Sequence, residues 1–352
     1  MALSVGVMGA AGYAGVELVR LLTAHPRFKL KVITSDAEAG TQLADTYPAF
    51  YGVDVPPFTK HTDPALLNCD VVFLAVPHTA AMKYVPKLLA AGVTVIDLSA
   101  DYRLDDPAVY EEWYNTPHTS PELLRERAFG LPELFGPELD QAASRHAAGK
   151  PVLVGCAGCY PTATSLAAAP AIRAGLTEGL VVVDAVSGVT GAGKKPTGRT
   201  HFCSANENLE AYGVGSHRHT PEIEQILGCP GRVLFTPHLA PLGRGLLSTV
   251  TLCIAADAEI SADRLQHLYE RFYQPSSLVS VLPAGMQPKT SSVVGTARAH
   301  IAVTFVPRVG AIVATAAIDN LCKGAAGQAL QCANIVCGFE ETCGLPGVGM
   351  PV

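Results

Sequence analysis

The sequence contains no apolar run that approaches the length of a membrane span, and it has no excess of positive charge. Its 25 Lys and Arg residues are outnumbered by 31 Asp and Glu residues, which gives a net charge of -6 at pH 7. This balance argues against a partner that is nucleic acid or an anionic membrane, although local basic residues can still bind a small anion. Internal repeats and low-complexity segments are absent, and the first residues lack the basic segment of a signal peptide.

What is present suits a compact, enzyme-like chain. Hydrophobic residues make up 49% and charged residues 16%, which excludes disorder, and 352 residues suit two domains with a core each. Ten irregularly spaced cysteines suit the reduced thiols of a cytoplasmic protein. Cys156 and Cys159 form a C-x-x-C without a second pair, so we expect no metal site. A redox pair is the alternative for these two thiols.

The first forty residues carry a dinucleotide-binding pattern. A Val-rich strand is expected over residues 3–8, followed by a turn with Gly9, Gly12 and Gly15 and by a helix that ends before Pro26. Residues 28–34 follow as a second strand. Glycines between a strand and a helix let the backbone approach a pyrophosphate at the helix N-terminus. The alternative is a Gly-rich turn that closes an ordinary β-α unit.

The end of the second strand bears on the choice of cofactor. It reads Thr34-Ser35-Asp36, about twenty residues after the last glycine. An acidic residue there accepts a hydrogen bond from the ribose 2′-hydroxyl of NAD, whereas Thr34 and Ser35 could hydrogen-bond the 2′-phosphate of NADP. The residues by themselves leave NAD and NADP open.

Two further strands are expected, over residues 70–76 and 93–98, with a helix over 80–91 between them. The carboxyl ends of parallel strands face the ligand crevice of a doubly wound sheet. Candidate ligand contacts at these ends are His78, Ser99 and Arg103, each of which could instead be a capping or solvated residue. We expect residues 105–150 to form a connector of short helices.

The next strand is expected over residues 152–154, and a possible nucleophile follows it. Cys159 is expected on a turn that leads into a helix, with Pro161 as its first residue and 162–169 as its body. Helix N–H groups and the helix dipole favour a thiolate there and could hold an oxyanion. The alternative is a small buried cysteine in a tight turn.

After a strand over residues 180–186, the segment 188–194 matches the first seven positions of a phosphate-binding P-loop. The eighth position should be Ser or Thr, but it is Lys195, and Pro196 and Gly198 prevent the helix that the motif needs. We therefore reject the P-loop and expect a basic, Gly-rich loop near an anionic substrate.

His217 and His219 precede an expected helix with Thr220 as its N-cap and Pro221 as its first residue. The positive end of that helix should lower the histidine pKa and keep one imidazole neutral as a base. Surface positions or metal ligation are the alternatives. The remaining expected elements are strands over 233–237, 248–255, 299–306 and 311–318, the last two as an antiparallel pair, and helices over 261–273 and 321–336.

Taken together, these motifs resemble the N-acetyl-gamma-glutamyl-phosphate reductase family of arginine biosynthesis over nearly the whole chain. The matching segments are Gly-Ala-Ala-Gly-Tyr-Ala-Gly at 9–15, Asp-Leu-Ser-Ala-Asp-Tyr-Arg at 97–103, Gly-Cys-Tyr-Pro-Thr at 158–162, Ser-Gly-Val-Thr-Gly-Ala-Gly at 187–193, His-Arg-His-Thr-Pro-Glu at 217–222 and Asp-Asn-Leu-Cys-Lys-Gly-Ala-Ala at 319–326. Six motifs in order are far more specific than any one of them.

The resemblance implies an α/β fold of the semialdehyde dehydrogenases, with a Rossmann-type doubly wound parallel sheet and an α+β catalytic and dimerisation domain. It places the dinucleotide-binding domain at 1–157, with the C-terminal helix 320–341 packing back on it, and the catalytic domain at 158–319. It also implies NADPH-dependent reduction of an acyl phosphate, N-acetyl-glutamyl 5-phosphate, through a cysteine thioester, in a homodimer or homotetramer.

The implied roles are these. Cys159 is the nucleophile, and His219 or His217 is the acid/base, with His219 favoured because it is nearer the helix and Glu222. The NADP(H) contacts are Gly9, Gly12, Tyr13, Ala14, Gly15, Thr34, Ser35 and Asn320, and the substrate contacts are Arg103 (for the phosphate), Ser187, Gly191 and Glu222.

The chain departs from the family pattern in two places. Ala157 stands where the family usually has Pro, with an additional Cys156 before it, which could permit an inactivating Cys156–Cys159 disulfide. Asp36 stands where a residue compatible with a phosphate is expected, which bears on the preference for NADP. The alternative functions are the same chemistry on another acyl phosphate, such as N-acetyl-aminoadipyl or aspartyl phosphate, and a dinucleotide sensor without catalysis.

Overall fold

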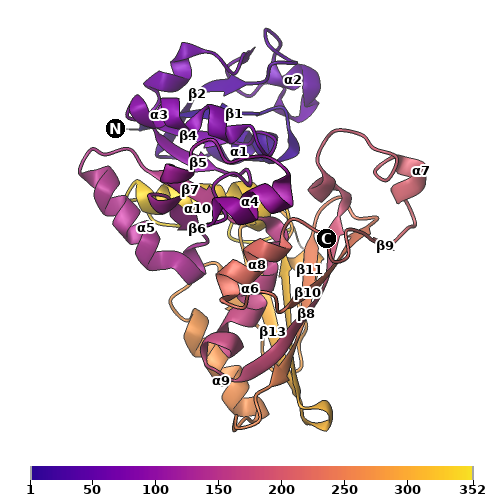
Figure 1. The fold of residues 1–352 in the computed structure, drawn as a ribbon. Helices are drawn as coiled ribbons and strands as arrows, with labels where there is room; N and C mark the ends of the chain where they lie inside the picture. The colour runs from indigo at the N-terminus through magenta and orange to yellow at the C-terminus, as the bar shows by residue number, and fades with distance from the viewer. Residues whose placement is uncertain (1, 351–352) are drawn as a thin grey trace. The chain divides into compact units, whose positions relative to one another are not determined.

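The computed structural model describes residues 2–350, which form two compact units (Figure 1). The first unit runs to Ala157 and resumes over Ala325–Leu345, and the second takes Gly158–Gly324 and the chain from Pro346. Each unit is built around one seven-stranded sheet. Within the described part of the chain, no helix has the length and apolar character needed to cross a membrane.

The first unit contains a parallel sheet whose strands are ordered β3-β2-β1-β4-β5-β7-β6. Its strands are β1 (Leu3–Met8), β2 (Phe28–Thr34), β3 (Phe58–Thr59), β4 (Val71–Leu74), β5 (Thr94–Asp97), β6 (Ala128–Gly130) and β7 (Leu153–Cys156). Every residue of β4, β5 and β7 is buried, as expected where helices cover both faces of a sheet. The predicted doubly wound parallel sheet is confirmed.

Six α-helices belong to this unit in the described residues. They are α1 (Tyr13–Thr23), α2 (Leu43–Thr46), α3 (Val85–Ala90), α4 (Pro107–Tyr114), α5 (Pro132–Ala147) and α10 (Gly327–Val336). Helix α10 contacts α5, β5 and β7, so a segment from the end of the chain completes the cover of the first sheet (Figure 1).

Several predicted elements of this unit need correction. The single helix expected over 80–91 is a short 3-10 turn (Ala81–Lys83) followed by α3, because Pro86 lacks an N–H group and suits the first turn of a new helix. The supposed connector 105–150 contains strand β6 and the sixteen-residue helix α5. The two-residue strand β3 at the sheet edge was not predicted.

The second unit contains a mixed sheet ordered β12-β13-β14-β11-β8-β10-β9. Its strands are β8 (Thr177–Gly188), β9 (Glu210–Ala211), β10 (Val233–Ala240), β11 (Leu246–Ile254), β12 (Val279–Val281), β13 (Ala299–Val306) and β14 (Ala311–Ile318). The antiparallel pairing of β13 with β14 has the predicted bounds, with Ala299 opposite Ile318 and Val306 opposite Ala311.

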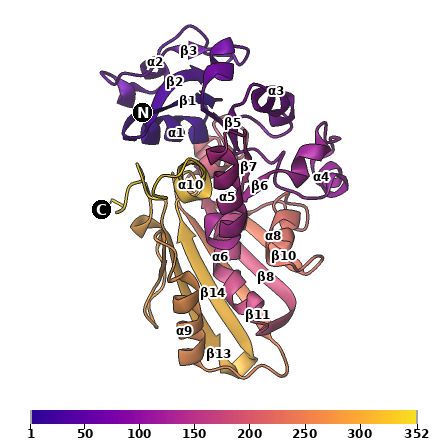
Figure 2. The same ribbon diagram turned by 90° about the vertical axis from the view of Figure 1, so that its left-hand side faces the viewer.

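Helices α6 (Cys159–Arg173), α7 (Phe202–Ala205), α8 (Thr220–Leu227) and α9 (Ala262–Tyr273) belong to this unit. Helix α6 is the central one, because it contacts β11, β14, α8 and α9, and it is buried from Tyr160 to Ala171 (Figure 2). The second unit begins at Gly158, so α6 is its first element.

Two helix starts differ from the prediction by one or two residues. Cys159 is the first residue of α6, with Gly158 as its N-cap, so the cysteine lies in the helix and not on the turn before it. His219, not Thr220, is the N-cap of α8. The loop after the 3-10 turn Val189–Ala192 forms no helix over residues 193–201, which agrees with the rejection of a P-loop.

Candidate active site

The turn from β1 to α1 leaves no room for a side chain at two of its three glycines, Gly9 and Gly15. Gly9 has a φ of +84°, and a Cβ on it would lie 2.4 Å from the carbonyl oxygen of Ala75. A Cβ on Gly15 would lie 2.2 Å from the carbonyl oxygen of Gly9. Gly12 is the N-cap of α1 and offers no side chain to its first N–H groups, those of Tyr13 and Ala14. This cradle fits a dinucleotide pyrophosphate.

At the end of β2, Thr34 is fully buried. Its carbonyl oxygen accepts hydrogen bonds from the N–H groups of Gly9 and Ala10, and its hydroxyl lies 2.7 Å from Nδ1 of His61. Thr34 therefore holds the glycine turn in place as well as lying beside the expected ribose site. His61 was not predicted from the sequence, because no motif links it to β2.

The two residues after Thr34 differ in exposure. Ser35 is 8% exposed, and its backbone N–H group bonds to Thr59. Asp36 is exposed and accepts a hydrogen bond at 2.8 Å from the backbone N–H group of His61. A fixed carboxylate thus stands at the end of β2, where the sequence pattern predicts the ribose hydroxyls of a dinucleotide.

The candidate contacts after β4 and β5 have partners within their own unit. His78 accepts a hydrogen bond through Nδ1 from the N–H group of Ala100. Ser99 donates its hydroxyl proton to Asp97, and burial raises the pKa of this carboxyl to about 7. Both side chains therefore shape the loop after β5.

Arg103 is buried, with 6% of its surface exposed. Its Nε donates to the carbonyl oxygen of Cys156 at 2.8 Å, and its Nη2 donates to the carbonyl oxygen of Leu98 at 2.7 Å. The guanidinium therefore ties the loop after β5 to the end of β7, three residues before Cys159.

The N-terminus of α6 presents the candidate nucleophile. Cys159 is half-buried, and the N–H group of Gly158 before it donates at 2.8 Å to Oε1 of Glu222. Glu222 is 1% exposed and lies in the first turn of α8. The N-termini of α6 and α8 are thus joined by a buried carboxylate, which fixes the residue directly before Cys159.

The two histidines before α8 differ in their surroundings. Nδ1 of His217 accepts a hydrogen bond from the backbone N–H group of His219, which leaves the neutral ring protonated on Nε2. Burial, and secondarily the charge of Arg218, lower the pKa of His217 to about 4. The predicted lowering is present for His217, but its main cause is desolvation and not the helix dipole.

The rings around the histidines form a cluster that the sequence did not reveal. The centroid of His217 lies 4.9 Å from that of His219, and Tyr160, Tyr212 and Phe235 contact His217 edge-on. Tyr212 donates to the hydroxyl of Tyr160, which donates to the carbonyl oxygen of His238. We name this group the tyrosine-histidine cluster. Its residues come from α6, from β10, from the segment directly after β9 and from the segment directly before α8.

Ser187, Gly191 and Asn320 lie together at the carboxyl end of β8. A Cβ on Gly191 would lie 2.8 Å from the Ser187 hydroxyl and 3.8 Å from the Asn320 amide. The Asn320 side chain accepts from the N–H group of Gly245 at 2.8 Å and donates to the Thr190 hydroxyl at 2.9 Å. Asn320 therefore holds the loops on both sides of this end of the sheet.

Cys156 and Cys159 are not joined by a disulfide in the structure. Cys156 is buried in the first unit and shares a hydrogen bond with the thiol of Cys332, which, with burial, raises its pKa well above the usual value. Among residues 2–350, no three His, Cys, Asp or Glu side chains are grouped so that they could hold a metal ion.

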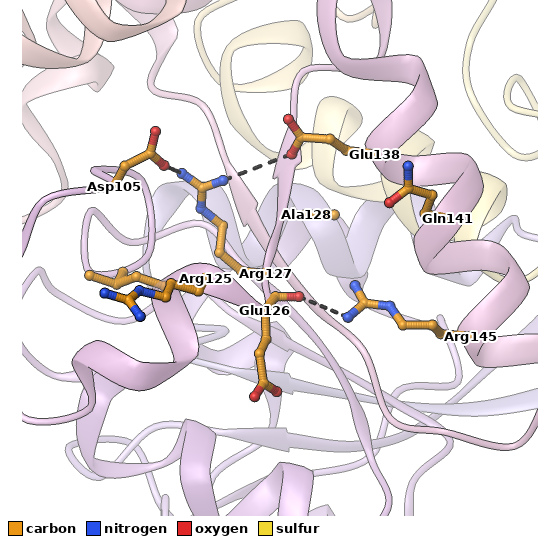
Figure 3. Close-up of a pocket in the computed structure, with 9 residues that line it drawn as sticks. Asp105, Arg125, Glu126, Arg127, Ala128, Glu138, Gln141 and Arg145 are labelled. Atoms are coloured by element: carbon orange, nitrogen blue, oxygen red, sulfur yellow. Dashed lines mark hydrogen bonds and ion pairs between the residues drawn. The ribbon is translucent and has the colours of Figure 1, made fainter.

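A pocket of about 610 Å³ in the first unit contains none of the predicted site residues (Figure 3). Arg127 lies at its centre, paired with Asp105 and 3.9 Å from a carboxylate oxygen of Glu138, and Arg145 donates to the carbonyl oxygen of Glu126. The pocket lies beside the amino end of β6, whereas the glycine turn lies at the carboxyl end of β1.

Comparison with known proteins matches two regions of the chain. Residues 4–142 match the NAD binding domain of semialdehyde dehydrogenases, and residues 159–320 match their dimerisation domain. Proteins called N-acetyl-gamma-glutamyl-phosphate reductase from Desulforamulus reducens and Halorhodospira halophila are 42% and 45% identical. The first alignment covers 99% of both chains and the second 98% of both.

Solved structures show the same fold at low identity. Aspartate semialdehyde dehydrogenase II from Vibrio cholerae, complexed with ASA, has a TM-score of 0.71 at 15% identity, and the match covers 96% of this chain and 98% of that one. Aspartate semialdehyde dehydrogenase with NADP from Candida albicans has a TM-score of 0.70 at 16% identity, with the same coverage. The nicotinamide-cofactor-binding domain and the dimerisation domain of the family are therefore both present.

Proposed function

The chain belongs to the N-acetyl-gamma-glutamyl-phosphate reductases of the semialdehyde dehydrogenase family, and we propose that it reduces N-acetyl-glutamyl 5-phosphate to N-acetyl-glutamate 5-semialdehyde and phosphate in arginine biosynthesis. The observation that carries this proposal is the thiol of Cys159 at the start of α6, where Glu222 holds the N–H group of the preceding residue. The relatives that bear this name match the chain over nearly its full length.

In this proposal, Cys159 attacks the acyl carbon of the substrate. The carbon–sulfur bond forms as the carbon–oxygen bond to phosphate breaks, and phosphate leaves with that electron pair. The N–H groups of the first turn of α6 stabilise the oxyanion, and the helix dipole favours the thiolate. A thioester is a suitable intermediate, because sulfur donates little electron density to the carbonyl and leaves its carbon open to reduction.

We assign the acid/base role in the collapse of the thiohemiacetal to His219 and a positioning role to His217. The Nδ1 atom of His217 already accepts the His219 N–H, and its pKa of about 4 keeps it neutral near pH 7. A general acid/base works best with a pKa near the working pH, which disfavours His217.

For the cofactor we propose NADP(H), which supplies the hydride when bound. The pyrophosphate would lie on the cradle of Gly9, Gly12 and Gly15 and the N-terminus of α1, with Tyr13 and Ala14 in the same turn. Ser35 would contact the ribose end beside Thr34, and Asn320 the nicotinamide end.

For the substrate we propose contacts from Ser187, Gly191 and Glu222 in the second unit, with Arg103 for the phosphate. The buried Arg103 and Glu222 would act partly by holding backbone groups of the residues that precede Cys159. We further propose that the chain works in the cytoplasm as a homo-oligomer, a dimer or a tetramer, which its dimerisation domain supports.

The proposal is tested by running the reaction backward. N-acetyl-glutamate 5-semialdehyde, phosphate and NADP or NAD are mixed with the protein, and the absorbance of the reduced nicotinamide is followed. We expect phosphate-dependent reduction that falls by at least about a thousandfold in Cys159→Ser, whereas the exposed Cys253→Ser stays at the wild-type rate. Near-native turnover of Cys159→Ser would exclude the thioester route.

A second candidate function is the same chemistry on aspartyl phosphate, favoured by the fold of the aspartate semialdehyde dehydrogenases. Turnover of aspartate semialdehyde and of the longer N-acetyl-aminoadipate semialdehyde is compared under the same conditions. A higher kcat/KM on either one than on the glutamate derivative would replace the proposed substrate. Tight dinucleotide binding without any turnover would favour a sensor.

A further inference from the structure

A π-helical turn joins the second sheet to the C-terminal helix. It begins at Cys322, four residues after the end of β14, and its position is fixed by Asp319. The Asp319 carboxylate is fully buried and accepts hydrogen bonds from the N–H groups of Leu321, Cys322 and Gly295, at 2.8, 3.0 and 2.7 Å. Single π-turns are rare and are often found at functional sites.

The third residue of this turn, Gly324, lies directly against Cys159. Its N–H group donates at 2.9 Å to the carbonyl oxygen of Asp319, five residues earlier. A Cβ on Gly324 would lie 2.6 Å from Cβ of Cys159 and 3.2 Å from its Cα. Real Cβ atoms do not approach each other below 3.0 Å.

The crowding at Gly324 is fixed by the main chain. The Cβ positions of both residues are set by their backbones, so no side-chain rotation relieves a contact of 2.6 Å. The φ angle of Gly324 is not in the left-handed region, so glycine is required here for space and not for backbone conformation. Any larger residue must move either the π-turn or the first turn of α6.

We propose that Gly324 is a positioning residue for the Cys159 thiol. The main chain of the π-turn covers one side of the Cys159 Cβ, which limits the positions that the sulfur can take. The Asp319 carboxylate holds the start of the π-turn, and the Glu222 carboxylate holds the N–H group of Gly158, the residue before Cys159. This inference rests on the proposed function, in which Cys159 is the nucleophile.

The test measures the reactivity of Cys159 in Gly324→Ala. The rate of its alkylation by iodoacetamide is followed by mass spectrometry of the peptide that carries Cys159, between pH 5 and 9. We expect the alkylation rate at pH 7 and kcat each to fall by at least roughly tenfold, with a changed pH profile of alkylation and an unchanged affinity for the dinucleotide. The matched control is Gly136→Ala in α5, where an added Cβ meets nothing within 4 Å, and it should change none of these values.

A second measurement covers the case in which Gly324→Ala folds poorly. Cys159→Gly removes the atom that the new methyl group would meet most closely. We expect Gly324→Ala to lower Tm in the wild-type background and to lower it much less in the Cys159→Gly background. Equal losses in both backgrounds, or wild-type alkylation and kcat in Gly324→Ala, would overturn the proposal.

These readouts separate the two levels of inference. Alkylation and melting do not require any reductase activity. If the wild-type protein fails to turn over the acyl phosphate, yet Gly324→Ala slows alkylation and the Tm coupling is present, the proposed function fails and the positioning role stands. If turnover is normal and the Tm coupling is absent, the proposed function stands and the positioning role of Gly324 fails.

Discussion

At the residue scale, the structure separates two histidines that the sequence could not. Both precede α8, and spacing alone gave no reason beyond proximity to the helix for choosing His219. The structure distinguishes them by the hydrogen bond from the His219 N–H group to Nδ1 of His217, and by the tyrosine-histidine cluster, whose rings desolvate His217. The ring cluster could not be predicted, because Tyr160 and Phe235 come from distant parts of the chain.

The assignment of the histidines is tested by two variants. His219→Asn should lower kcat by roughly 10²- to 10⁴-fold and remove one ionisation from its pH profile. In His217→Asn, the amide oxygen can accept the His219 N–H in place of Nδ1, so we expect a loss of less than about tenfold. The measurement is kcat from pH 5 to 9, and a larger loss in His217→Asn than in His219→Asn would exchange the two roles.

Asp36 gives a prediction about the choice of cofactor. Its carboxylate is exposed and held by the His61 N–H group, so it would repel a 2′-phosphate bound at the end of β2. A unit charge pair at 4 Å in water is worth about 1 kcal/mol, and the phosphate carries nearly two charges. Asp36→Ser should therefore raise the kcat/KM ratio of NADP to NAD by roughly tenfold.

The matched control for Asp36 is Glu111→Gln, which removes an exposed carboxylate from α4. It should leave the NADP-to-NAD ratio at the wild-type value. An unchanged ratio in Asp36→Ser would show that this carboxylate does not face the ribose of the bound cofactor.

At the element scale, long periodic segments were predictable and helix starts were less so. The bounds of β1, β2, β13 and β14 agree with the sequence patterns to the residue. The expected start of α6 at Pro161 was wrong. Proline suits the first turn generally, and here it occupies the third helical position, so Cys159 is helical.

The π-turn at Cys322 could not be predicted. A continuous helix was expected over residues 321–336, whereas residues 322–326 form a π-turn before α10. The carboxylate of Asp319 accepts hydrogen bonds from the N–H groups of Leu321 and Cys322 at its start. The π-turn lies where Gly324 closely approaches Cys159, a contact between segments more than 160 positions apart in the sequence. Local propensity contains no information about such a contact.

The link between α8 and α6 is tested at Glu222. Glu222→Ala leaves the buried N–H group of Gly158 without its acceptor, which should lower the free energy of unfolding by about 1–3 kcal/mol. Glu222→Gln keeps an acceptor oxygen of the same length and should lose less. Chemical denaturation compares the two, and Cys159 alkylation should be slowed more in the alanine variant. Equal stability of both variants would contradict the importance of this bond.

At the scale of the whole molecule, the class of both units followed from the order of elements. A Gly-rich turn between a strand and a helix, with a second strand after the helix, predicts a doubly wound sheet. The later run of strands predicts a second α+β unit. What the sequence could not supply is the placement of pieces within each sheet, such as β6 at the edge beyond β7. That order depends on crossover connections whose length does not determine their path.

The pH dependence of stability also belongs to the whole molecule, because different groups change the free energy of unfolding in opposite directions. Burial lowers the pKa of His217 to about 4 from 6.5, so the unfolded chain binds this proton more readily, and the stability that His217 contributes is lost as the pH falls from 6.5 to 4. Burial raises the pKa of Asp97 to about 7, so the folded state binds its proton more readily and gains stability over the same acidification. The net curve therefore cannot isolate either group.

A difference between two proteins isolates His217. The wild-type protein should lose on the order of 3 kcal/mol through this residue between pH 6.5 and 4, and His217→Asn should lose none of it, because asparagine does not titrate. Urea denaturation of both proteins at half-unit steps of pH gives the difference in their free energies of unfolding. This difference should shift in favour of the variant as the pH falls through 6.5 and level off near 4, whereas a difference independent of pH would mean that the imidazole of His217 titrates alike in the folded and unfolded chains.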